Sequence, residues 1–319
     1  QKVYVKHINE KEFLHFVDYY KMDMNWFSHV DDLKDDPISK MTFICENQEE
    51  VLKHGAYLSK DYDICYHRGC HTFDICQKHI SKGTAIDILK DNASGYDIEI
   101  NQDLADKVEI YGRLLKEWND KINLTAIKDD EGIAVKHFLD CLLVSKVADF
   151  KDGMNVIDVG TGAGFPGLVI AAAYPNVNVT LLDSTGKKLK AVENMAEEMG
   201  VKNVKIVHSR AEEAGKNPEF REKYDFATAR AVAELRVLLE YTLPFVKKDG
   251  YFLSLKAATA KEEIEGAGNS LKTLGGKIEG INDFTLPGGD KRAIIKVKKI
   301  SQTSPKYPRP SAQIAKKPL

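Results

Sequence analysis

A short glycine-rich turn, Gly160-Thr161-Gly162-Ala163-Gly164, constrains the fold of this 319-residue chain more than any other feature. The turn follows an apolar run, NVIDV, and precedes GFPGLVIAAAY, a helical pattern with Pro166 near its first turn, where proline is tolerated. Glycines in this position allow the backbone to approach a ligand closely. A strand, a glycine turn and a helix in this order predict an α/β fold with a ligand at the carboxyl end of the first strand.

The alternation of strands and helices continues after this turn. We expect helices over 186–200, 231–246 and 258–274, and strands over 177–183, 204–209, 224–230 and 250–256. Residues 276–286 and 291–300 are typical of a closing antiparallel pair of strands. Strands separated by helices of this length indicate a mostly parallel, Rossmann-like sheet that is covered on both faces.

The first 92 residues differ in composition from the rest. They carry 12 basic and 16 acidic residues, whereas residues 93–319 carry 34 and 32, and they hold four of the five cysteines and seven of the nine histidines. Strands at 40–47 and 62–67, a helix at 47–58 and a helix opening at Lys82 predict a small α+β segment. The expected domains are 1–92, a helical part at 96–150 with apolar stripes over 104–118 and 133–146, a Rossmann-like domain at 151–300 and an irregular basic tail at 301–319.

Bulk properties favour a cytoplasmic chain without a membrane partner. No apolar run reaches the roughly 18 residues of a membrane span, and the N-terminal residues lack an apolar signal core. An odd number of cysteines favours reduced thiols. Six cysteines and histidines that lie close together suggest a zinc site: Cys65, His67, Cys70, His71, Cys76 and His79. Their spacings do not form paired C-x2-C units, so no metal site is predicted.

Two acidic residues bear on the ligand of the glycine turn. Asp183, at the end of the second strand, suits the ribose of either a dinucleotide or S-adenosylmethionine. Asp158 lies two residues before Gly160, which we expect to be the mouth of the site. A diphosphate about 5 Å from a carboxylate would cost roughly 3 kcal/mol per charge pair at an effective dielectric of 20. Asp158 therefore favours the cationic S-adenosylmethionine, unless it only caps a turn or the helix start.

Seven segments of the chain resemble one family. In order they are YGRLLKEWNDKINLTAI, IDVGTGAGFPG, LLDSTGKKLKAVEN, SRAEE, FATARAVAEL, GYFLSLK and KYPRPSAQIAKKPL. Over about residues 96–319 they resemble the bacterial small-subunit ribosomal RNA methyltransferase G family. The resemblance implies a class I S-adenosylmethionine-dependent methyltransferase fold and methylation of N7 of a guanine in 16S rRNA.

The resemblance also implies roles for single residues. Asp183 would hold the ribose, and Ala211 and Glu212 would flank the adenine. Arg230 would lie near the methionine portion or the substrate, unless it forms a structural ion pair with Glu234. The complete set expected to bind the cofactor is Asp158, Gly160, Gly162, Gly164, Phe165, Asp183, Ala211, Glu212 and Arg230.

Phe165 has two interpretations, because a cofactor contact and an ordinary core aromatic fit it equally. The chemistry makes few demands on side chains. Guanine N7 has a free lone pair, so in-line displacement at the sulfonium methyl requires orientation and desolvation. We expect no obligatory catalytic base, nucleophile or metal, with Arg230 at most orienting substrate or cofactor.

Basic residues suggest where RNA binds. Residues 291–319 contain nine Lys/Arg and no acid, and the KYPR string at 306–309 places Lys306 and Arg309 beside an aromatic ring. A disordered, solubilising tail is the alternative, and a histidine such as His137 is often structural. The residues expected to contact RNA are Lys121, Asn123, Lys136, His137, Lys306 and Arg309. The expected partner is 16S rRNA or a precursor of the small ribosomal subunit, bound by a monomer.

The strings FICENQEEVLKH and ISKGTAIDILKDN resemble part of the Cof-type haloacid dehalogenase-like phosphatases, with Lys82 at the place of the phosphate-neutralising lysine. The D-x-D-x-T nucleophile motif and the G-D-x-x-N-D magnesium motif are missing, so phosphatase activity is not expected. Two other functions stay open for the whole chain. One is a dinucleotide-dependent oxidoreductase, for which we find no acid/base residues, and the other is a noncatalytic RNA-binding fusion protein.

Overall fold

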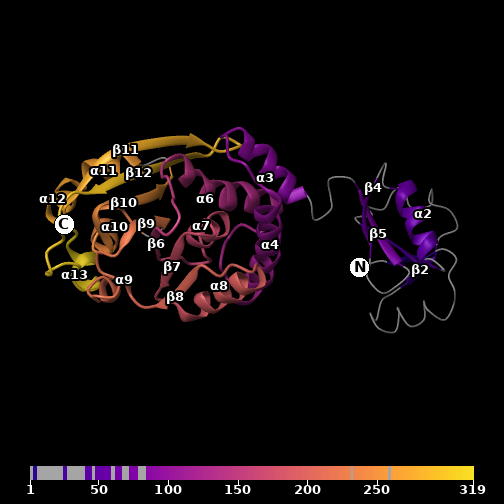
Figure 1. Ribbon diagram of the computed structural model, residues 1–319, viewed down its shortest axis with the longest axis horizontal. Coiled ribbons are helices and arrows are strands. Elements are labelled where there is room, and N and C mark those ends of the chain that lie inside the picture. Colours follow the sequence, from indigo (N-terminus) through magenta and orange to yellow (C-terminus); the bar gives the residue numbers. More distant parts are fainter. Residues whose placement is uncertain are drawn as a thin grey trace. The chain divides into compact units, whose positions relative to one another are not determined.

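The computed structural model describes residues 3–5, 24–26, 40–44, 47–58, 62–66, 72–77, 84–230, 233–257 and 260–319. Their contacts divide the chain into two compact units, Gln1–Thr84 and Ala85–Leu319 (Figure 1). Within the described part of the chain, none of the helices combines the length and the apolar composition that crossing a bilayer requires.

The first unit contains a three-stranded antiparallel sheet with the order β3-β5-β4. Its strands are β3 (Lys40–Ile44), β4 (Tyr62–Tyr66) and β5 (Thr72–Gln77), and α2 (Gln48–Leu58) lies between β3 and β4 in sequence, as predicted. A parallel pair, β1 (Val3–Val5) and β2 (Met24–Trp26), completes the described part. Lys82 and the side chains of the histidines and cysteines considered for zinc lie outside the described residues.

Helix α3 (Thr84–Ser94) packs with the second unit. Ile86, Leu89 and Ala93 form an apolar stripe at helical spacing, and all three are buried in the core of that unit. Residues 92–95, which lie between the expected segments 1–92 and 96–150, are therefore the end of a helix and the start of a turn. The structure divides the chain between Thr84 and Ala85, earlier than the predicted boundary at Asn92.

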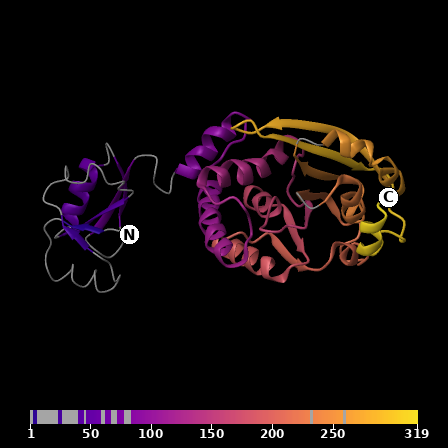
Figure 2. The same ribbon diagram turned by 180° about the vertical axis from the view of Figure 1, so that it is seen from behind.

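The second unit is built on a seven-stranded sheet with the order β11-β12-β10-β9-β6-β7-β8. Five strands are parallel, and β12 pairs antiparallel with both β10 and β11, which confirms the closing antiparallel pair. The β11–β12 hairpin runs along one edge of the sheet (Figures 1 and 2). The strands are β6 (Asn155–Val159), β7 (Asn178–Asp183), β8 (Val204–His208), β9 (Tyr224–Arg230), β10 (Val246–Lys256), β11 (Gly276–Thr285) and β12 (Lys291–Lys299).

Both faces of this sheet are covered, because side chains alternate along each strand. In β6, Val156 belongs to one hydrophobic cluster and Ile157 to the other. The first face is covered by α4 (Gln102–Ile122), the helical run α5 (Asp130–Gly132), η2 (Ile133–Leu139), α6 (Asp140–Leu142) and η3 (Leu143–Lys146), α7 (Gly167–Ala173) and α8 (Gly186–Glu198). The second is covered by α9 (Ala211–Ala214), α10 (Leu235–Thr242), α11 (Ala260–Glu265) and α12 (Gly268–Leu274).

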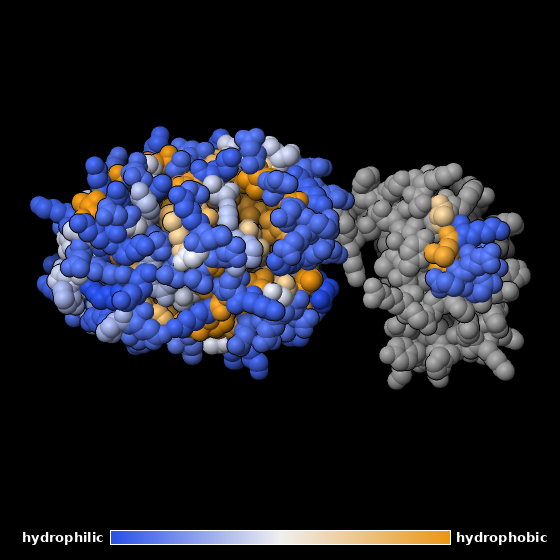
Figure 3. All heavy atoms as spheres, viewed as in Figure 1, coloured by the Kyte–Doolittle hydropathy of each residue, from blue (hydrophilic) through white to orange (hydrophobic). Residues whose placement is uncertain are grey.

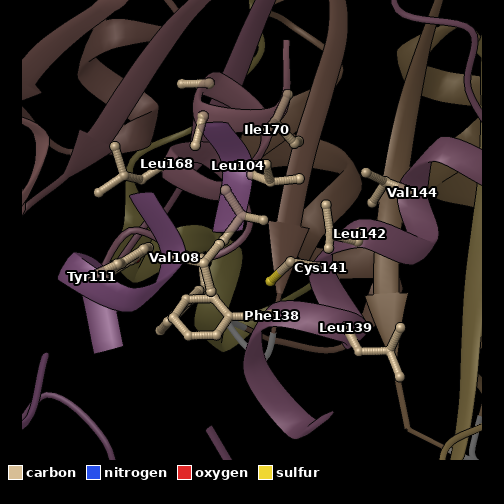
Figure 4. Close-up of a cluster of buried hydrophobic side chains, with 14 of the residues drawn as sticks. Leu104, Val108, Tyr111, Phe138, Leu139, Cys141, Leu142, Val144, Leu168 and Ile170 are labelled. Atoms are coloured by element: carbon tan, nitrogen blue, oxygen red, sulfur yellow. The ribbon is translucent and has the colours of Figure 1, made fainter. Parts of the chain in front are cut away.

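Helix α4 joins the helical extension to the sheet domain. Asn101 caps its N-terminus by accepting a hydrogen bond from the Leu104 backbone, 2.9 Å away. Its predicted apolar stripe is buried, and Figure 4 shows Leu104, Val108 and Tyr111 of α4 beside Leu168 of α7 and Phe138 of η2. This packing holds α4 directly against the helix that follows the glycine turn.

The C-terminal residues 301–319 are folded onto the second unit, in contrast to the irregular tail expected. Arg221 donates to the backbone carbonyls of Thr303 (2.6 Å) and Tyr307 (2.8 Å). The last helix, α13 (Ser311–Lys316), buries Ile314 completely. The face of this unit seen in Figure 3 is largely hydrophilic, with hydrophobic residues showing in patches.

Candidate functional site

A pocket of about 920 Å³ opens where the parallel strands end. The residues after β6, β7, β8, β9 and β10 all contribute to its walls. Six residues between 124 and 140 of the helical extension, Tyr241 of α10, Glu263 of α11 and Arg292 of β12 also line it. Parallel strands all end at the same edge of a sheet, which is where α/β proteins bind ligands. The seven predicted cofactor residues that line it are Gly160, Gly162, Phe165, Asp183, Ala211, Glu212 and Arg230.

The glycine turn forms the floor of this pocket. Gly160, Gly162 and Gly164 have φ angles of 75°, 60° and 100°, a region that residues with a side chain enter only at a cost. The backbone N–H groups of Gly160 and Thr161 donate to the carbonyl of Leu182, at 2.8 and 3.0 Å. The turn is thereby fixed to the end of the neighbouring strand β7.

Asp183 is held in place by backbone donors on both of its oxygens. Oδ2 accepts from Gly162 N at 2.9 Å, and Oδ1 accepts from Thr185 N at 2.8 Å. The residue is 9% exposed and lines the pocket. Each carboxylate oxygen has a second lone pair, so Asp183 can still accept hydrogen bonds from a ligand hydroxyl.

Phe165 belongs to an aromatic cluster at the pocket wall. Its ring stacks with Tyr111 at a centroid distance of 5.1 Å and with His137 at 4.6 Å. The guanidinium carbon of Arg230 lies 4.8 Å from the ring centroid. At 4% exposure, Phe165 is both a core aromatic and a lining residue, so its two interpretations are compatible.

Arg230 links the end of β9 to the helical extension. Its Nη1 donates to Asp140 Oδ2 at 3.1 Å, and its Nη2 donates to His137 Nδ1 at 3.2 Å. Arg292 Nε lies 3.4 Å from the other Asp140 oxygen. The alternative named above, a structural ion pair, is formed with Asp140 and not with Glu234, which pairs with Arg236.

His137 is buried in this network and lines the pocket, and its expected contact with RNA stays a prediction. Nδ1 accepts from Arg230 and therefore carries no proton, so Nε2 is the donor to Thr125 Oγ1, 2.7 Å away. Burial and the neighbouring Arg230 charge lower the pKa of His137 to about 4. The ring is therefore neutral at pH 7, and it is 8% exposed.

Asp158 lies behind the glycine turn and not at the mouth of the pocket. It is fully buried, and it accepts hydrogen bonds from Gly167 N (3.0 Å) and Thr228 Oγ1 (2.9 Å). Burial raises the pKa of Asp158, against the effect of these hydrogen bonds. The side chain points inward because it caps the start of α7, which is the structural alternative named above. Gly164, the other predicted residue outside the lining, lies against Tyr111 and Leu168.

Four residues expected to contact RNA are on the surface. Lys121 and Asn123 are exposed at the end of α4, where Lys121 Nζ lies 5.1 Å from the Trp118 ring. Lys136 lines the pocket and pairs with Asp290 at 3.0 Å. Lys306 is exposed in the C-terminal segment. Their RNA contacts stay predictions.

Arg309 is instead occupied by a buried partner. Its Nε and Nη2 donate to the two oxygens of Glu240, at 2.8 and 2.6 Å, and its backbone N–H adds a third hydrogen bond. Glu240 is completely buried, and the Arg309 side chain is only 15% exposed. The hydrogen bonds to Glu240 hold the guanidinium of Arg309 away from solvent. Because Glu240 belongs to α10, they also fix the C-terminal segment to that helix.

Several pocket residues were not predicted from the sequence. Lys256 lies at the end of β10 and donates to the Ala233 carbonyl at 2.6 Å, and its position at a strand end is a signal that could have identified it. Glu263 lies on α11, and Arg292 is an ordinary basic residue of β12. No local motif distinguishes Glu263 or Arg292, because only the fold brings them to the pocket.

The strand order, the reversed closing hairpin and the pocket above a glycine turn define a class I methyltransferase fold. The chain belongs to the rRNA small subunit methyltransferase G family, whose sequence model matches residues 104–294. This match confirms the family resemblance and lies within residues 96–319, over which that resemblance was found.

Curated relatives agree with this assignment. A ribosomal RNA small subunit methyltransferase G of Acetivibrio thermocellus is 47% identical over 233 residues, which cover 73% of this chain and 96% of that protein. A protein of the same name from Clostridium perfringens is 45% identical over 234 residues, covering 73% of this chain and 98% of the relative. Nearly the whole length of each relative is therefore present here.

Solved structures give more distant matches. The YcgJ protein of Bacillus subtilis is 16% identical, with a TM-score of 0.41 and coverage of 52% of this chain and 100% of that structure. A 16S rRNA adenine-N1 methyltransferase from Catenulisporales acidiphilia, solved with its cosubstrate SAM, is 16% identical, with a TM-score of 0.40 and coverage of 48% and 88%. Likeness at this level does not bear on function.

Proposed function

We propose that this chain transfers the methyl group of S-adenosylmethionine to N7 of a guanine in 16S rRNA. The observation that carries the proposal is its alignment with proteins named small subunit rRNA methyltransferase G over 96–98% of their length. The pocket at the strand ends supports it, since seven of its lining residues belong to the set expected to bind the cofactor.

The pocket fits S-adenosylmethionine in size and in the chemistry of its walls. A volume of about 920 Å³ is at the upper end of the range for small-molecule sites. Asp183 offers acceptors for the ribose hydroxyls, and the backbone of Gly160 and Gly162 allows close approach. Ala211 and Glu212 line the part beyond β8, where adenine would lie. The cofactor supplies a methyl group on a positively charged sulfur.

The protein's task in this reaction is to orient and desolvate. The lone pair of guanine N7 lies free in the plane of the base, so no side chain has to remove a proton. Arg230, held by Asp140 and His137, presents a rigid cation at the wall between cofactor and substrate. Positioning of this kind provides several kcal/mol of rate enhancement.

We further propose that the RNA approaches across the exposed cations Lys121, Lys136 and Lys306 and the amide of Asn123. Lysines at the surface contribute affinity through phosphate contacts, which weaken as salt is added. The substrate would be 16S rRNA or a precursor of the small ribosomal subunit, and the chain would act as a monomer in the cytoplasm. The Cof-type likeness of residues 1–92 remains a hypothesis from sequence, without an assigned activity.

Methyl transfer tests the proposal. Labelled S-adenosylmethionine is incubated with small-subunit rRNA or particles that lack the modification, with the full chain and with a version starting at Ala85. We expect both versions to transfer label, and mass spectrometry of digested RNA to find 7-methylguanosine. Activity of the short version should equal or exceed that of the full chain, because the pocket lies wholly within residues 124–292. Absence of label with both versions contradicts the proposal.

A further inference from the structure

Among the described residues, four carboxylates line the pocket, and three of them have partners that account for them. Asp140 pairs with Arg230 and Arg292 through its two oxygens. Asp183 is held by backbone N–H groups on both oxygens. Glu212 pairs with Arg210 at 2.6 Å. The fourth carboxylate, Glu263, differs in the way its two oxygens are used.

Only one oxygen of Glu263 is occupied. Oε2 accepts from the backbone N–H of Leu235 at 2.6 Å and lies 2.7 Å from Lys256 Nζ. None of the residues that the structure describes donates to Oε1, although the side chain is only 18% exposed and lines the pocket. Oε1 is not a buried atom, so water can reach it at the pocket wall, and the donor of a ligand can take the place of that water. We propose that Oε1 of Glu263 recognises the target guanine by accepting from its N1–H and its exocyclic amino group.

The chemistry of guanine favours an acceptor at this place. Guanine presents two adjacent donors on its Watson–Crick edge, N1–H and the N2 amino group, and an ionised carboxylate has only acceptors. Enzymes that modify a base take it out of the stack and read this edge. Oε1 has two lone pairs, enough for both donors. Adenine presents an acceptor at N1, which the carboxylate would repel.

The position of Glu263 fits the geometry of attack at N7. The Watson–Crick edge lies on the opposite side of the purine from N7, so its partner must lie away from the cofactor's methyl group. In the sheet order β10-β9-β6-β7, β10 is two strands from β6 and lies on the side opposite β7. With strands ~4.8 Å apart, the end of β10 lies about 10 Å from the glycine turn. Glu263, in contact with Lys256 at that end, is at the far side of the pocket from Asp183.

Replacing Glu263 with glutamine distinguishes a role in recognising guanine from a purely structural role. In Glu263→Gln, the amide oxygen can replace Oε2 and still accept from Leu235 and Lys256. The amide NH2 then takes the place of Oε1 and opposes the donors of guanine. Glu262 is an exposed neighbour on the same helix, and Glu262→Gln is the matched control.

The test compares guanine with inosine, which lacks the N2 amino group but keeps N7. The modified position is first mapped with the wild-type chain, and 16S rRNA carrying guanine or inosine there is then prepared by ligation and assembled into particles. For the wild type, kcat/KM should be roughly 10- to 100-fold higher on guanine than on inosine. In Glu263→Gln this ratio should fall to within about threefold of one, whereas Glu262→Gln should keep the wild-type ratio.

Since this assignment rests on the proposed function, its failure must be recognisable separately. A wild-type chain that methylates neither particle refutes the proposed function itself. A wild type that discriminates while Glu263→Gln keeps the same guanine-to-inosine ratio refutes the role of Glu263, whatever its absolute activity. An equal loss on both substrates also refutes it, because that is the effect of a structural residue. Melting temperature and S-adenosylhomocysteine affinity should match the wild type, which shows that the variant is folded.

Discussion

The hydroxyl of Tyr111 on α4 donates a hydrogen bond to the carbonyl of Ala163, 2.6 Å away in the glycine turn. Both residues are buried, and 52 positions separate them in the sequence. The same tyrosine ring stacks on Phe165. The helical extension therefore fixes the floor of the pocket, which makes it part of the binding site.

Replacing Tyr111 with phenylalanine should weaken both the fold and the pocket. The Ala163 carbonyl would lose its hydrogen bond while it stays buried, which costs about 1–3 kcal/mol. We expect a loss of unfolding free energy of this size and a several-fold weaker affinity for S-adenosylhomocysteine, measured by denaturation and calorimetry. Tyr251→Phe is the control, because no described residue bonds its hydroxyl. Equal effects of the two substitutions would show that the contact to Ala163 contributes nothing.

Gly164 should tolerate a side chain less than another glycine of similar backbone conformation. Gly164 and Gly153 have φ angles of 100° and 80°, but a Cβ on Gly164 would lie 2.5 Å from the Tyr111 hydroxyl, whereas one on Gly153 meets nothing within 4 Å. Gly153→Ala should cost about 1 kcal/mol for the backbone alone. Gly164→Ala should cost about 2 kcal/mol more and reduce cofactor binding. Thermal denaturation of the two variants should separate them clearly; equal melting temperatures would refute the predicted clash.

The Arg309–Glu240 pair should matter for stability and not for RNA binding. Arg309→Ala leaves a fully buried carboxylate without its partner, which costs about 3–5 kcal/mol. Lys306→Ala, at an exposed position three residues earlier, should change stability by less than about 0.5 kcal/mol. It should instead lower the salt dependence of RNA binding by about one unit of slope. A stable Arg309→Ala variant with weakened RNA binding would restore the interpretation of Arg309 as an RNA contact.

His137 should make the stability of the fold depend on pH. Its pKa is lowered from 6.5 in the unfolded chain to about 4 in the fold. As the pH falls below 6.5, the unfolded chain binds a proton at this histidine before the folded chain does. The contribution of His137 to the unfolding free energy is therefore fully present above pH 6.5 and is lost as the pH falls toward 4. The loss should approach about 3 kcal/mol. The unfolding free energy of the wild type minus that of His137→Gln should therefore fall over this pH range. A difference that stays flat over this pH range would contradict the buried neutral state of His137.

The fold was predictable from the sequence where the signal is local. The apolar stripe of α4 and the apolar strands on either side of the glycine turn specify their elements through periodicity alone. The predicted boundary at Asn92 differs from the division between Thr84 and Ala85, because the apolar residues of α3 do not show in sequence that they pack in the core of the second unit. The place of β12 between β10 and β11 likewise depends on pairing that no single segment encodes.

The sequence could predict those site residues whose role follows from their position at the end of a strand. Asp183 fulfils this condition, and it lines the pocket. Asp158 was misplaced because alternation turns its side chain away from the strand tip and toward Gly167. Arg309 bonds Glu240, 69 positions away, and His137 bonds Arg230, 93 positions away. The sequence around each residue therefore did not show that its side chain has a partner within the protein. Glu263 could not be identified without the fold.

The central claim is that the pocket above the glycine turn binds S-adenosylmethionine and that Asp183 holds it. Calorimetric titration with S-adenosylhomocysteine and with NADH tests this for the wild type, Asp183→Ala and the exposed control Asp149→Ala. S-adenosylhomocysteine should bind the wild type and Asp149→Ala equally and Asp183→Ala roughly 10- to 100-fold more weakly, and NADH should not bind. Tighter binding of NADH, or an affinity for S-adenosylhomocysteine that Asp183→Ala leaves unchanged, would contradict the claim.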